Sequence, residues 1–312
     1  MPSTTEVHVD QILTNLSIAY PAPDVIWQKV LPQIKVAKRS DKYYVYSKDD
    51  LHRIYADAIG PTAYANEVDY DLSTDNYSVE DHALEGWISQ AAIDNQDKPL
   101  DLMRDKTEFI ARWLNLAQEA RTAAIVFDSA SYPAANKVTL SGTSQWGGSA
   151  DDPINDVLAA VEGCFVRANT LVFGADTWLK FRALPEILDA VKSSSRYQGS
   201  PGGLATQSEV ASLFEIDNLL IGRARYNTAK KGQTGAYSRV WGKHCSALYV
   251  EPLPTTLSIT FGATFSEMNF ETVRGFDERR GVKGSHFIKT AWNTDEKIIA
   301  SDTGYMIVDA VA

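Results

Sequence analysis

The sequence predicts an α+β fold, and three stretches of the chain support that class. The stretch 98–128 repeats apolar residues every three or four positions, which is the spacing of one long helix. The stretch 151–250 mixes helical patterns with short apolar runs typical of buried strands. The stretch 251–312 shows strand patterns alone, so this chain combines a mixed segment with separate helical and strand segments.

The composition is that of a folded protein long enough for two domains. The 312 residues are 44% hydrophobic and 10% aromatic, which allows a substantial core. Thirty basic residues stand against 40 acidic ones, a formal net charge of −10. Proteins that grip nucleic acid through its phosphates carry basic surfaces. We therefore expect this chain to repel nucleic acid on average, although a local basic face stays compatible with the sequence.

The cysteines and the apolar runs exclude several classes of protein. Cys164 and Cys245 are the two cysteines and no C-x-x-C pair exists, which excludes a zinc site built from cysteines. We expect two reduced thiols, with a disulfide as the alternative. The N-terminus lacks the basic and apolar regions of a signal peptide. No apolar run has the length of a membrane span, so no membrane partner is expected.

Residues 1–40 read as an extended arm, because four prolines interrupt every candidate helix longer than two turns. Many residues of the arm are nevertheless apolar: Ile12, Leu13, Leu16, Ile18, Val25, Ile26, Trp27, Val30, Leu31, Ile34 and Val36. These side chains must be buried on the arm's own domain or on a neighbouring subunit. We expect Trp27, Val30 and Leu31 to be exposed if the chain stays alone.

Residues 41–90 read as a projecting hairpin. Tyr44 and Tyr46 alternate with smaller residues, and Val68, Tyr70 and Leu72 alternate with polar ones, the period of half-exposed strands. A turn is predicted at 74–76, followed by a strand from Tyr77 to Val79. The middle of the segment, 48–66, contains few large aliphatic residues, namely Leu51, Ile54 and Ile59. It should therefore contribute little to a core.

The long helix is predicted over 98–128, roughly 45 Å in length at 1.5 Å per residue. Asp97 is the expected N-cap, Pro99 lies in the first turn, and Glu108 is expected to pair with Arg112. The predicted apolar face consists of Met103, Ile110, Trp113, Ala117, Ala120, Ala124 and Phe127, widened by Phe109 and Leu116.

The remaining elements are predicted in order as follows: a short strand at Val138–Leu140, a helix over 153–166 capped by Asp152, a strand over 170–173, a helix over 175–192 restarted at Pro185, a flexible loop over 193–203, a helix over 207–214, a strand over 219–224, a turn over 230–235 and a strand over 238–250. Further strands are expected at 257–261, 287–288, 298–299 and 306–308.

No pattern in the chain indicates catalysis or metal binding. The phosphate-binding glycine motifs and the G-x-S-x-G elbow are absent. His244 and Cys245 are neighbours in a predicted strand and would point to opposite faces, so they cannot form a dyad with each other. The spacing of Asp69, Asp71, Ser73, Asp75 and Glu80 approaches that of a calcium loop, but Thr74 occupies the position that needs Gly. The five histidines, His8, His52, His82, His244 and His286, show no metal-ligand spacing. We therefore predict no catalytic, cofactor-binding or metal site and a structural role, not an enzyme.

The order of parts is arm, charged hairpin, long helix, compact α/β insertion and returning strands. In this order of parts the chain resembles the major capsid proteins of tailed bacteriophages, which have the Hong-Kong-97-type or Johnson fold. Three stretches, 169–192, 208–227 and 235–250, also resemble these proteins in local sequence. The positions that carry this local similarity are Leu220, Gly222, Arg223, Ala224, Tyr226, Asn227, Trp241 and Gly242.

The resemblance implies a set of domains. Residues 1–40 would be the N-arm and 41–90 the E-loop. Residues 91–150 and 251–312 would form the peripheral (P) domain, with a spine helix at 98–128. Residues 151–250 would be the axial (A) domain, with the loop 193–203 and the turn 230–235 as candidates for its mobile tip.

The resemblance also implies a function. The chain would self-assemble into pentamers and hexamers of an icosahedral head that encloses double-stranded DNA without sequence-specific binding. It would use no cofactor, reside in the virion and assemble in the host bacterial cytoplasm. A portal and a separate scaffolding protein would be partners, and a decoration protein is an open alternative. No motif identifies a cross-linking pair among Lys42, Lys48 and Asn293.

Two other functions remain as alternatives. An encapsulin-type compartment shell would share the fold, and a cargo-enzyme gene beside its own would distinguish it from a phage protein. An α/β hydrolase-like enzyme would be a monomer with a deep polar pocket.

Overall fold

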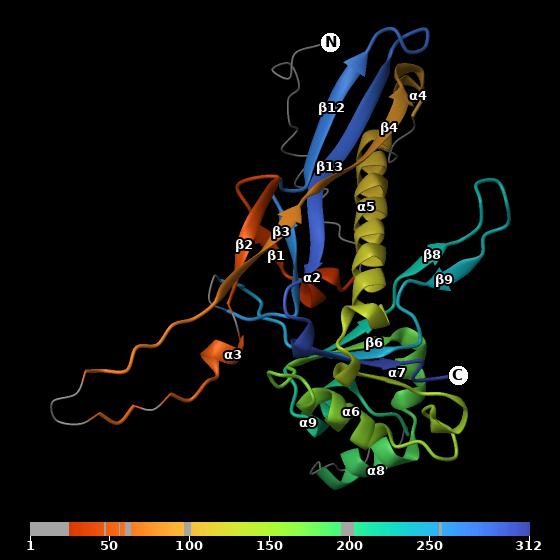
Figure 1. Cartoon of the computed structure of the whole chain (residues 1–312). Helices are drawn as coiled ribbons and strands as arrows, with labels where there is room; N and C mark the ends of the chain where they lie inside the picture. Colours follow the sequence, from red (N-terminus) through yellow and green to blue (C-terminus); the bar gives the residue numbers. More distant parts are fainter. Residues whose placement is uncertain are drawn as a thin grey trace.

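The computed structural model describes residues 25–46, 48–55, 57–59, 64–96, 101–194, 203–255 and 258–312. Most of the predicted arm (1–24), the predicted cap Asp97 and most of the loop 193–203 lie outside these residues. Figure 1 shows an elongated molecule, with one sheet and a long helix standing on a compact α/β unit and two thin projections leaving it on opposite sides.

The first sheet is built around one long strand, β13 (Ser285–Ile298). Its strand order is β1-β11-β13-β12, and β4 also pairs with β13. The bounds are Gln33–Lys35 for β1, Gly262–Ser266 for β11, Glu271–Asp277 for β12 and Glu80–Ser89 for β4. The pairing of β4 with β13 runs from Ser285↔Ser89 to Thr294↔Glu80. The end of the predicted hairpin segment 41–90 is therefore a strand of this sheet.

The long helix α5 (Leu102–Val126) packs along β13 and β4, as Figure 1 shows. It begins four residues later than predicted, because the Asp101 side chain accepts from the backbone N–H groups of Met103 and Arg104 and so serves as N-cap. The predicted Glu108–Arg112 pair is also wrong, since Glu108 pairs with Arg104 at 3.0 Å.

The predicted apolar face of this helix is confirmed only in part. Ile110 is buried and Met103 packs against a buried cluster, but Phe109 and Trp113 are half exposed. Ala117, Ala120 and Ala124 face solvent. The buried residues of α5 are Thr107, Ile110, Ala111, Leu114, Asn115, Gln118, Glu119, Thr122, Ala123 and Val126. Half of them are polar. Gln118 and Glu119 bond to other elements, whereas Thr107 and Asn115 donate to carbonyl groups of their own helix. A pattern of hydrophobicity alone could not find such a face.

The second sheet has the order β5-β14-β10-β6-β7. These strands are Lys137–Thr139 (β5), Gly304–Val308 (β14), Cys245–Leu248 (β10), Thr170–Gly174 (β6) and Asn218–Gly222 (β7). The helices of this unit are α6 (Pro153–Glu162), α7 (Ala175–Phe181), α8 (Pro185–Ser194) and α9 (Gln207–Leu213). The predicted cap Asp152 and the restart at Pro185 are confirmed.

One prediction about this sheet is wrong. The segment 238–250 is not one strand, because the chain leaves β9 at Arg239 and enters β10 only at Cys245. The last strand, β14, pairs with β10 and β5 and not with the strands that precede it in sequence. Its four-residue antiparallel register with β10 and its parallel pairing with β5 place it between these two strands in the second sheet.

An apolar cluster joins the two sheets into one body. It contains Val30, Leu31, Ala123, Val126, Tyr132, Val172, Leu220, Trp241, Leu248, Val250, Phe261 and Met306. The ring of Tyr132 stacks on that of Phe261 with centroids 5.2 Å apart. Gly304 makes this stacking possible, since a Cβ there would lie 2.4 Å from the Phe261 ring.

The remaining elements are short. They are α2 (Trp27–Val30), β2 (Ser40–Tyr46), α3 (Lys48–Leu51), β3 (Leu72–Ser78), α4 (Gln90–Asp94), β8 (Arg225–Asn227) and β9 (Tyr237–Arg239), with 3-10 turns at Ser129–Ser131, Ala134–Asn136, Gly142–Ser144 and Ser301–Thr303. The predicted turn at 74–76 is wrong, because these residues pair with β2 inside β3. None of the described helices is long and apolar enough to cross a membrane.

Candidate assembly surfaces

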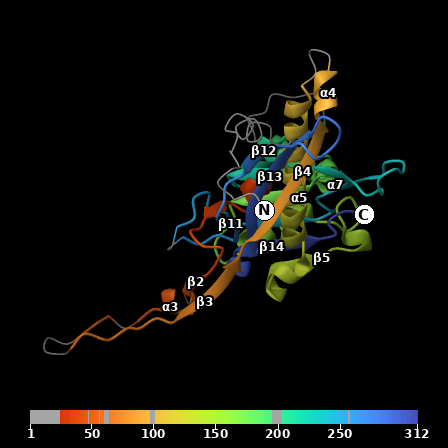
Figure 2. The same ribbon diagram turned by 90° about the horizontal axis from the view of Figure 1, so that it is seen from above.

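The first projection consists of β2, β3 and the chain between them, and is called the projecting loop below (residues 40–78). Its two strands pair antiparallel from Ser40↔Ser78 to Tyr46↔Leu72. Beyond that register the chain runs outward from the body, which is visible from above in Figure 2. The sequence folds this way because its few large aliphatic residues supply no core of their own.

The root of the projecting loop is fixed to the first sheet by aromatic packing. The ring of Tyr77 stacks on Phe265 of β11 at 4.9 Å, and Tyr43 lies 5.5 Å from the same ring. The Tyr43 hydroxyl donates to Asp75 at 2.7 Å. Burial and this hydrogen bond raise the pKa of Tyr43, while the bond from Tyr43 holds the pKa of Asp75 below its usual range.

The outer part of the projecting loop exposes large side chains that a monomer has no reason to display. Ile54 is 98% exposed and Tyr64 is 97% exposed. Tyr44, Ile59, Val68, Tyr70 and Leu72 are also exposed. A set of apolar and aromatic side chains on a thin extension has no core within reach, so it is suited to burial against another molecule.

A second set of contacts ties the loop to the α/β unit. Lys48 of α3 forms an ion pair with Asp302 at 2.6 Å, and its ammonium lies 5.1 Å from the centre of the Phe165 ring. The His52 ring meets the same Phe165 ring edge-on at 4.9 Å. The projecting loop is therefore held within the subunit both by the first sheet and by the α/β unit.

The chain after residue 24 is held by a buried carboxylate. Glu119 on α5 is fully buried and accepts from the backbone N–H of Trp27 at 2.9 Å and from that of Ile26 at 3.0 Å. It also accepts from the indole N–H of Trp241 at 2.6 Å. Burial raises the pKa of Glu119, and these hydrogen bonds oppose part of that rise.

This anchoring corrects one expectation. Trp27, Val30 and Leu31 are each 1% exposed or less within a single chain. The Trp27 ring packs edge-on against Trp292 at 5.4 Å. These residues therefore need no neighbouring subunit, whereas Ile54 and Tyr64 of the projecting loop are almost fully exposed.

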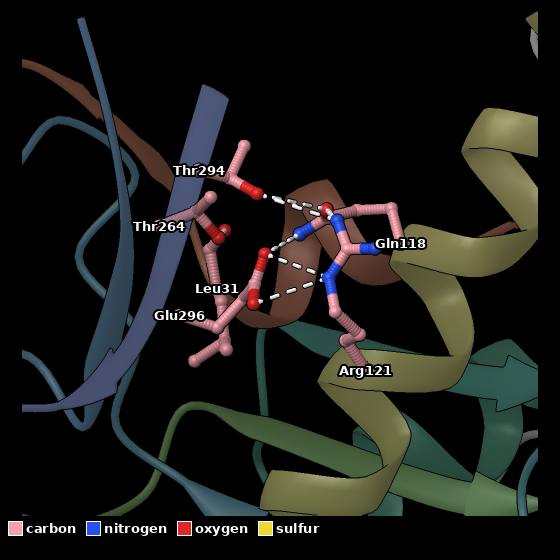
Figure 3. Close-up of polar contacts among 6 residues, drawn as sticks. All are labelled: Leu31, Gln118, Arg121, Thr264, Thr294 and Glu296. Carbon is pink, nitrogen blue, oxygen red and sulfur yellow. Dashed lines mark hydrogen bonds and ion pairs between the residues drawn. The ribbon is translucent and has the colours of Figure 1, made fainter. Parts of the chain in front are cut away.

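A polar network clamps α5 to β13 just beside this anchor (Figure 3). The Glu296 carboxylate accepts from Gln118 at 2.6 Å and pairs with Arg121 at 3.4 Å. Arg121 also donates to the Gln118 side-chain oxygen and to Thr294. The Glu296 side chain is only 8% exposed. Each member has a partner, so the buried charge is compensated and the helix is fixed in one register against the sheet.

The residues considered for catalysis or metal binding lie apart from any shared site. Cys245 is enclosed in the core of the second sheet, and burial raises its pKa well above the usual range. The His244 ring accepts from the backbone N–H of Asp309 at 2.9 Å, and burial lowers its pKa. Asp75 is engaged by Tyr43. Within the described ranges, no group of three or more His, Cys, Asp and Glu side chains could hold a metal ion.

The second projection is the hairpin of β8 and β9, which leaves the α/β unit on the side opposite the projecting loop in Figure 1. Sequence reasoning located its turn, 230–235, but not its extent. Its polar, basic sequence between two apolar segments was the available signal.

Comparisons with known proteins agree with this architecture. No profile of a known protein family matches the chain. The chain is 32% identical over 307 residues to the major capsid protein of Pseudomonas phage JBD67, covering 97% of each. It is similar to the crystal structure of a phage-related protein from Bordetella bronchiseptica, with a TM-score of 0.76 and 24% identity over 97% of this chain and 98% of the other. It is also similar to the capsid structure of cyanophage P-SCSP1u, with a TM-score of 0.62 and 7% identity over 91% and 88% of the two chains.

The identity to the Pseudomonas phage protein over nearly the full length of both chains shows the family, and the structural neighbours show the fold. The fold is the Hong-Kong-97-type capsid fold, and the role is that of a structural shell protein located in the virion capsid. The chain belongs to the family of phage major capsid proteins.

Proposed function

We propose that this chain forms pentamers and hexamers that close into the icosahedral head of a tailed phage around double-stranded DNA. The observation that supports this proposal best is the projecting loop, which is fixed at its root and exposes Ile54 and Tyr64 almost fully at its outer part. A surface of this kind extends the contact area beyond what the compact body offers. Repeated around a symmetry axis, it joins each copy to the next.

The proposed domains follow the fold family, with two boundaries adjusted to the strand pairing. We propose the projecting loop (40–78) as the E-loop and assign β4 to the P domain with β11, β12 and β13, because β4 pairs with β13 over its whole length. We assign β5 and β14 to the A domain, because they lie in the sheet of β6 and β10.

The proposed partners come from the resemblance to tailed-phage capsid proteins. A portal, a separate scaffolding protein and assembly in the host cytoplasm are proposed on that ground, and a decoration protein stays open. The net charge of −10 fits a shell that encloses DNA without gripping it. The encapsulin-type alternative is less favoured, because the curated relatives are phage capsid proteins.

The proposal is tested by electron microscopy and sedimentation of the purified protein. The expected result is pentamers, hexamers or closed shells, and a monomer at every protein and salt concentration would refute it. The informative variant replaces residues 48–66 with a short Gly/Ser linker.

Within the subunit this replacement removes two ion pairs, Lys48–Asp302 and Asp50–Arg53, each worth about 0.2–1 kcal/mol. It also removes a cation–π contact worth about 0.5–1 kcal/mol and the edge-on contact of His52 with Phe165. The altered loop length changes the closure free energy by about 0.6 kcal/mol per doubling. The variant should therefore fold and melt cooperatively, yet give capsomers at most. Normal shells from this variant would show that the loop is not an assembly element. The matched control is Lys48→Ala, which removes the contacts to Asp302 and Phe165 but keeps the loop.

A further inference from the structure

The β8–β9 hairpin concentrates positive charge in a strongly acidic protein. Residues 223–243 contain no acidic residue and six basic ones: Arg223, Arg225, Lys230, Lys231, Arg239 and Lys243. Among the residues that the structure describes, only one of these six, Arg239, forms an ion pair, with Asp176 at 3.5 Å. The side chains of the other five are free of ion pairs within the described part of the chain, and all five residues are exposed.

Two of these positive charges face each other across the hairpin, which lowers its own stability. Arg225 and Arg239 lie directly opposite each other in the ladder, and like charges at such positions destabilise a strand pair. The backbone around the tip is nevertheless ordered by the Asn227 side chain, which accepts from the N–H groups of Ala229 and Ala236. Arg239 pairs with Asp176 and donates to the Arg223 carbonyl, whereas the other five cations of the hairpin have no ion pair in the described part of the chain.

A hollow lies at the base of the hairpin. It has a volume of about 410 Å³ and is lined by Arg225, Arg239 and Lys243, by one acidic residue, Asp176, which pairs with Arg239, and by Tyr237, Ser238, Trp241 and Gly242. Arg225 and Lys243 are the cations of this lining that have no ion pair in the described part of the chain. Tyr237 is 71% exposed and Tyr226 is 41% exposed. Tyrosine and arginine side chains are enriched at protein–protein interfaces, since they combine apolar area with hydrogen bonding and charge.

The projecting loop has the complementary character. Residues 49–75 contain one arginine, Arg53, and seven acidic residues: Asp49, Asp50, Asp57, Glu67, Asp69, Asp71 and Asp75. Two of the seven are paired inside the subunit, Asp50 with Arg53 and Asp75 with Lys297. In the described residues, the other five form no ion pair, and they are exposed beside the aromatic side chains of Tyr64 and Tyr70.

The two projections leave the body in opposite directions in both views (Figures 1 and 2), so they cannot meet within one chain. A contact between two different surface elements of identical chains is heterologous, and it generates a ring when the rotation between copies closes. We infer that the β8–β9 hairpin is a docking site for the acidic projecting loop of a second copy. This inference rests on the proposed function and adds the location of one contact between copies and the complementary charges that would form it.

The inference is tested by reversing charges on the two elements and then restoring the match. The double variant Lys230→Glu, Lys231→Glu puts two acidic side chains on the hairpin. They would then face Asp69 and Asp71 on the projecting loop of the second copy, so the inferred attraction becomes repulsion. We expect the protein concentration at half-assembly to rise by about tenfold or more, because like charges across an interface are strongly unfavourable. Adding Asp69→Lys and Asp71→Lys to the same chain should restore assembly. The matched control is Lys180→Glu with Lys192→Glu, which changes the net charge equally on helices α7 and α8 and should assemble at near the unmodified concentration.

Each outcome decides between explanations. Normal assembly of the hairpin variant overturns the inference, as does a loss of assembly that the loop changes do not restore. A variant that assembles normally but no longer retains added double-stranded DNA in a binding assay would identify the hairpin as a nucleic-acid contact and overturn the inference as well. Failure of the unmodified chain to form shells refutes the proposed function and is visible before any variant is compared.

A second measurement covers the case of a misfolded variant. Mixing a Lys231→Cys chain with an Asp69→Cys chain and adding a short bifunctional maleimide should link the two copies. The native thiols Cys164 and Cys245 are both buried and give little background. Absence of the linked dimer under assembly conditions would overturn the inference.

Discussion

Removal of the Glu119 carboxylate tests how the N-terminal segment is attached. In Glu119→Ala, three N–H donors lose their acceptor: those of Ile26, Trp27 and the Trp241 indole. A buried donor left unsatisfied costs about 1–3 kcal/mol. The Trp27 and Trp241 donors are buried and the Ile26 donor is partly buried. Part of this cost is offset, because the variant no longer buries a carboxylate.

We expect a net loss of about 3–4 kcal/mol, corresponding to a decrease in Tm of about 5 °C for a chain of this length. Calorimetry or circular dichroism would measure it. Limited trypsin digestion at the exposed Lys29 gives a local reading, since cleavage there should become faster when the segment detaches. A loss below about 1 kcal/mol with unchanged cleavage would refute the anchoring role of the carboxylate.

The pH dependence gives an independent check on the same group. Burial raises the folded-state pKa of Glu119 above the ordinary value of about 4.3. Its contribution to stability is therefore fully present below the unfolded pKa and is lost as the pH rises through the folded pKa. Glu119→Gln cannot titrate, so the unmodified chain should gain stability relative to this variant as the pH falls from neutral. A pH-independent difference between the two would contradict the raised pKa.

Three further outcomes are expected. Arg121→Met should lower the free energy of unfolding by about 2–3 kcal/mol, because it leaves the nearly buried Glu296 charge without its cation. In denaturant unfolding, the double variant with Glu296→Leu should lose clearly less than the sum of the two single variants. Additive losses would contradict a coupled pair. Gly174→Ala should lower the free energy of unfolding by about 3 kcal/mol or reduce the soluble yield, because the added Cβ would lie 1.8 Å from the main-chain oxygen of Gly242. An unchanged Tm would contradict this packing. Burial raises the pKa of Cys164 to about 12 and that of Cys245 well above its usual range, so mass spectrometry should find neither thiol alkylated by iodoacetamide at mildly alkaline pH until the chain is denatured; rapid labelling of the folded chain would contradict their burial.

The absence of a catalytic motif left the order of parts as the main source of functional information. That order was sufficient, since an arm, a hairpin, a long helix, an α/β insertion and returning strands match the fold of the structural neighbours. Local signals also sufficed at the starts of two helices. Asp152 caps α6 and Pro185 begins α8 for reasons contained in their own side chains.

The sequence by itself therefore determined the fold class, the chain order of the parts and the starts of α6 and α8. The tertiary structure alone decided which face of α5 is buried, because that face carries Gln118 and Glu119, whose burial depends on hydrogen-bond partners more than ninety residues away in the chain. It also decided that β4 and β14 belong to different sheets from their sequence neighbours, since strand pairing is fixed by partners distant in sequence. The opposed directions of the acidic loop and the basic hairpin are likewise properties of the folded chain, because a charge pattern in the sequence carries no direction until the strands beneath it are paired.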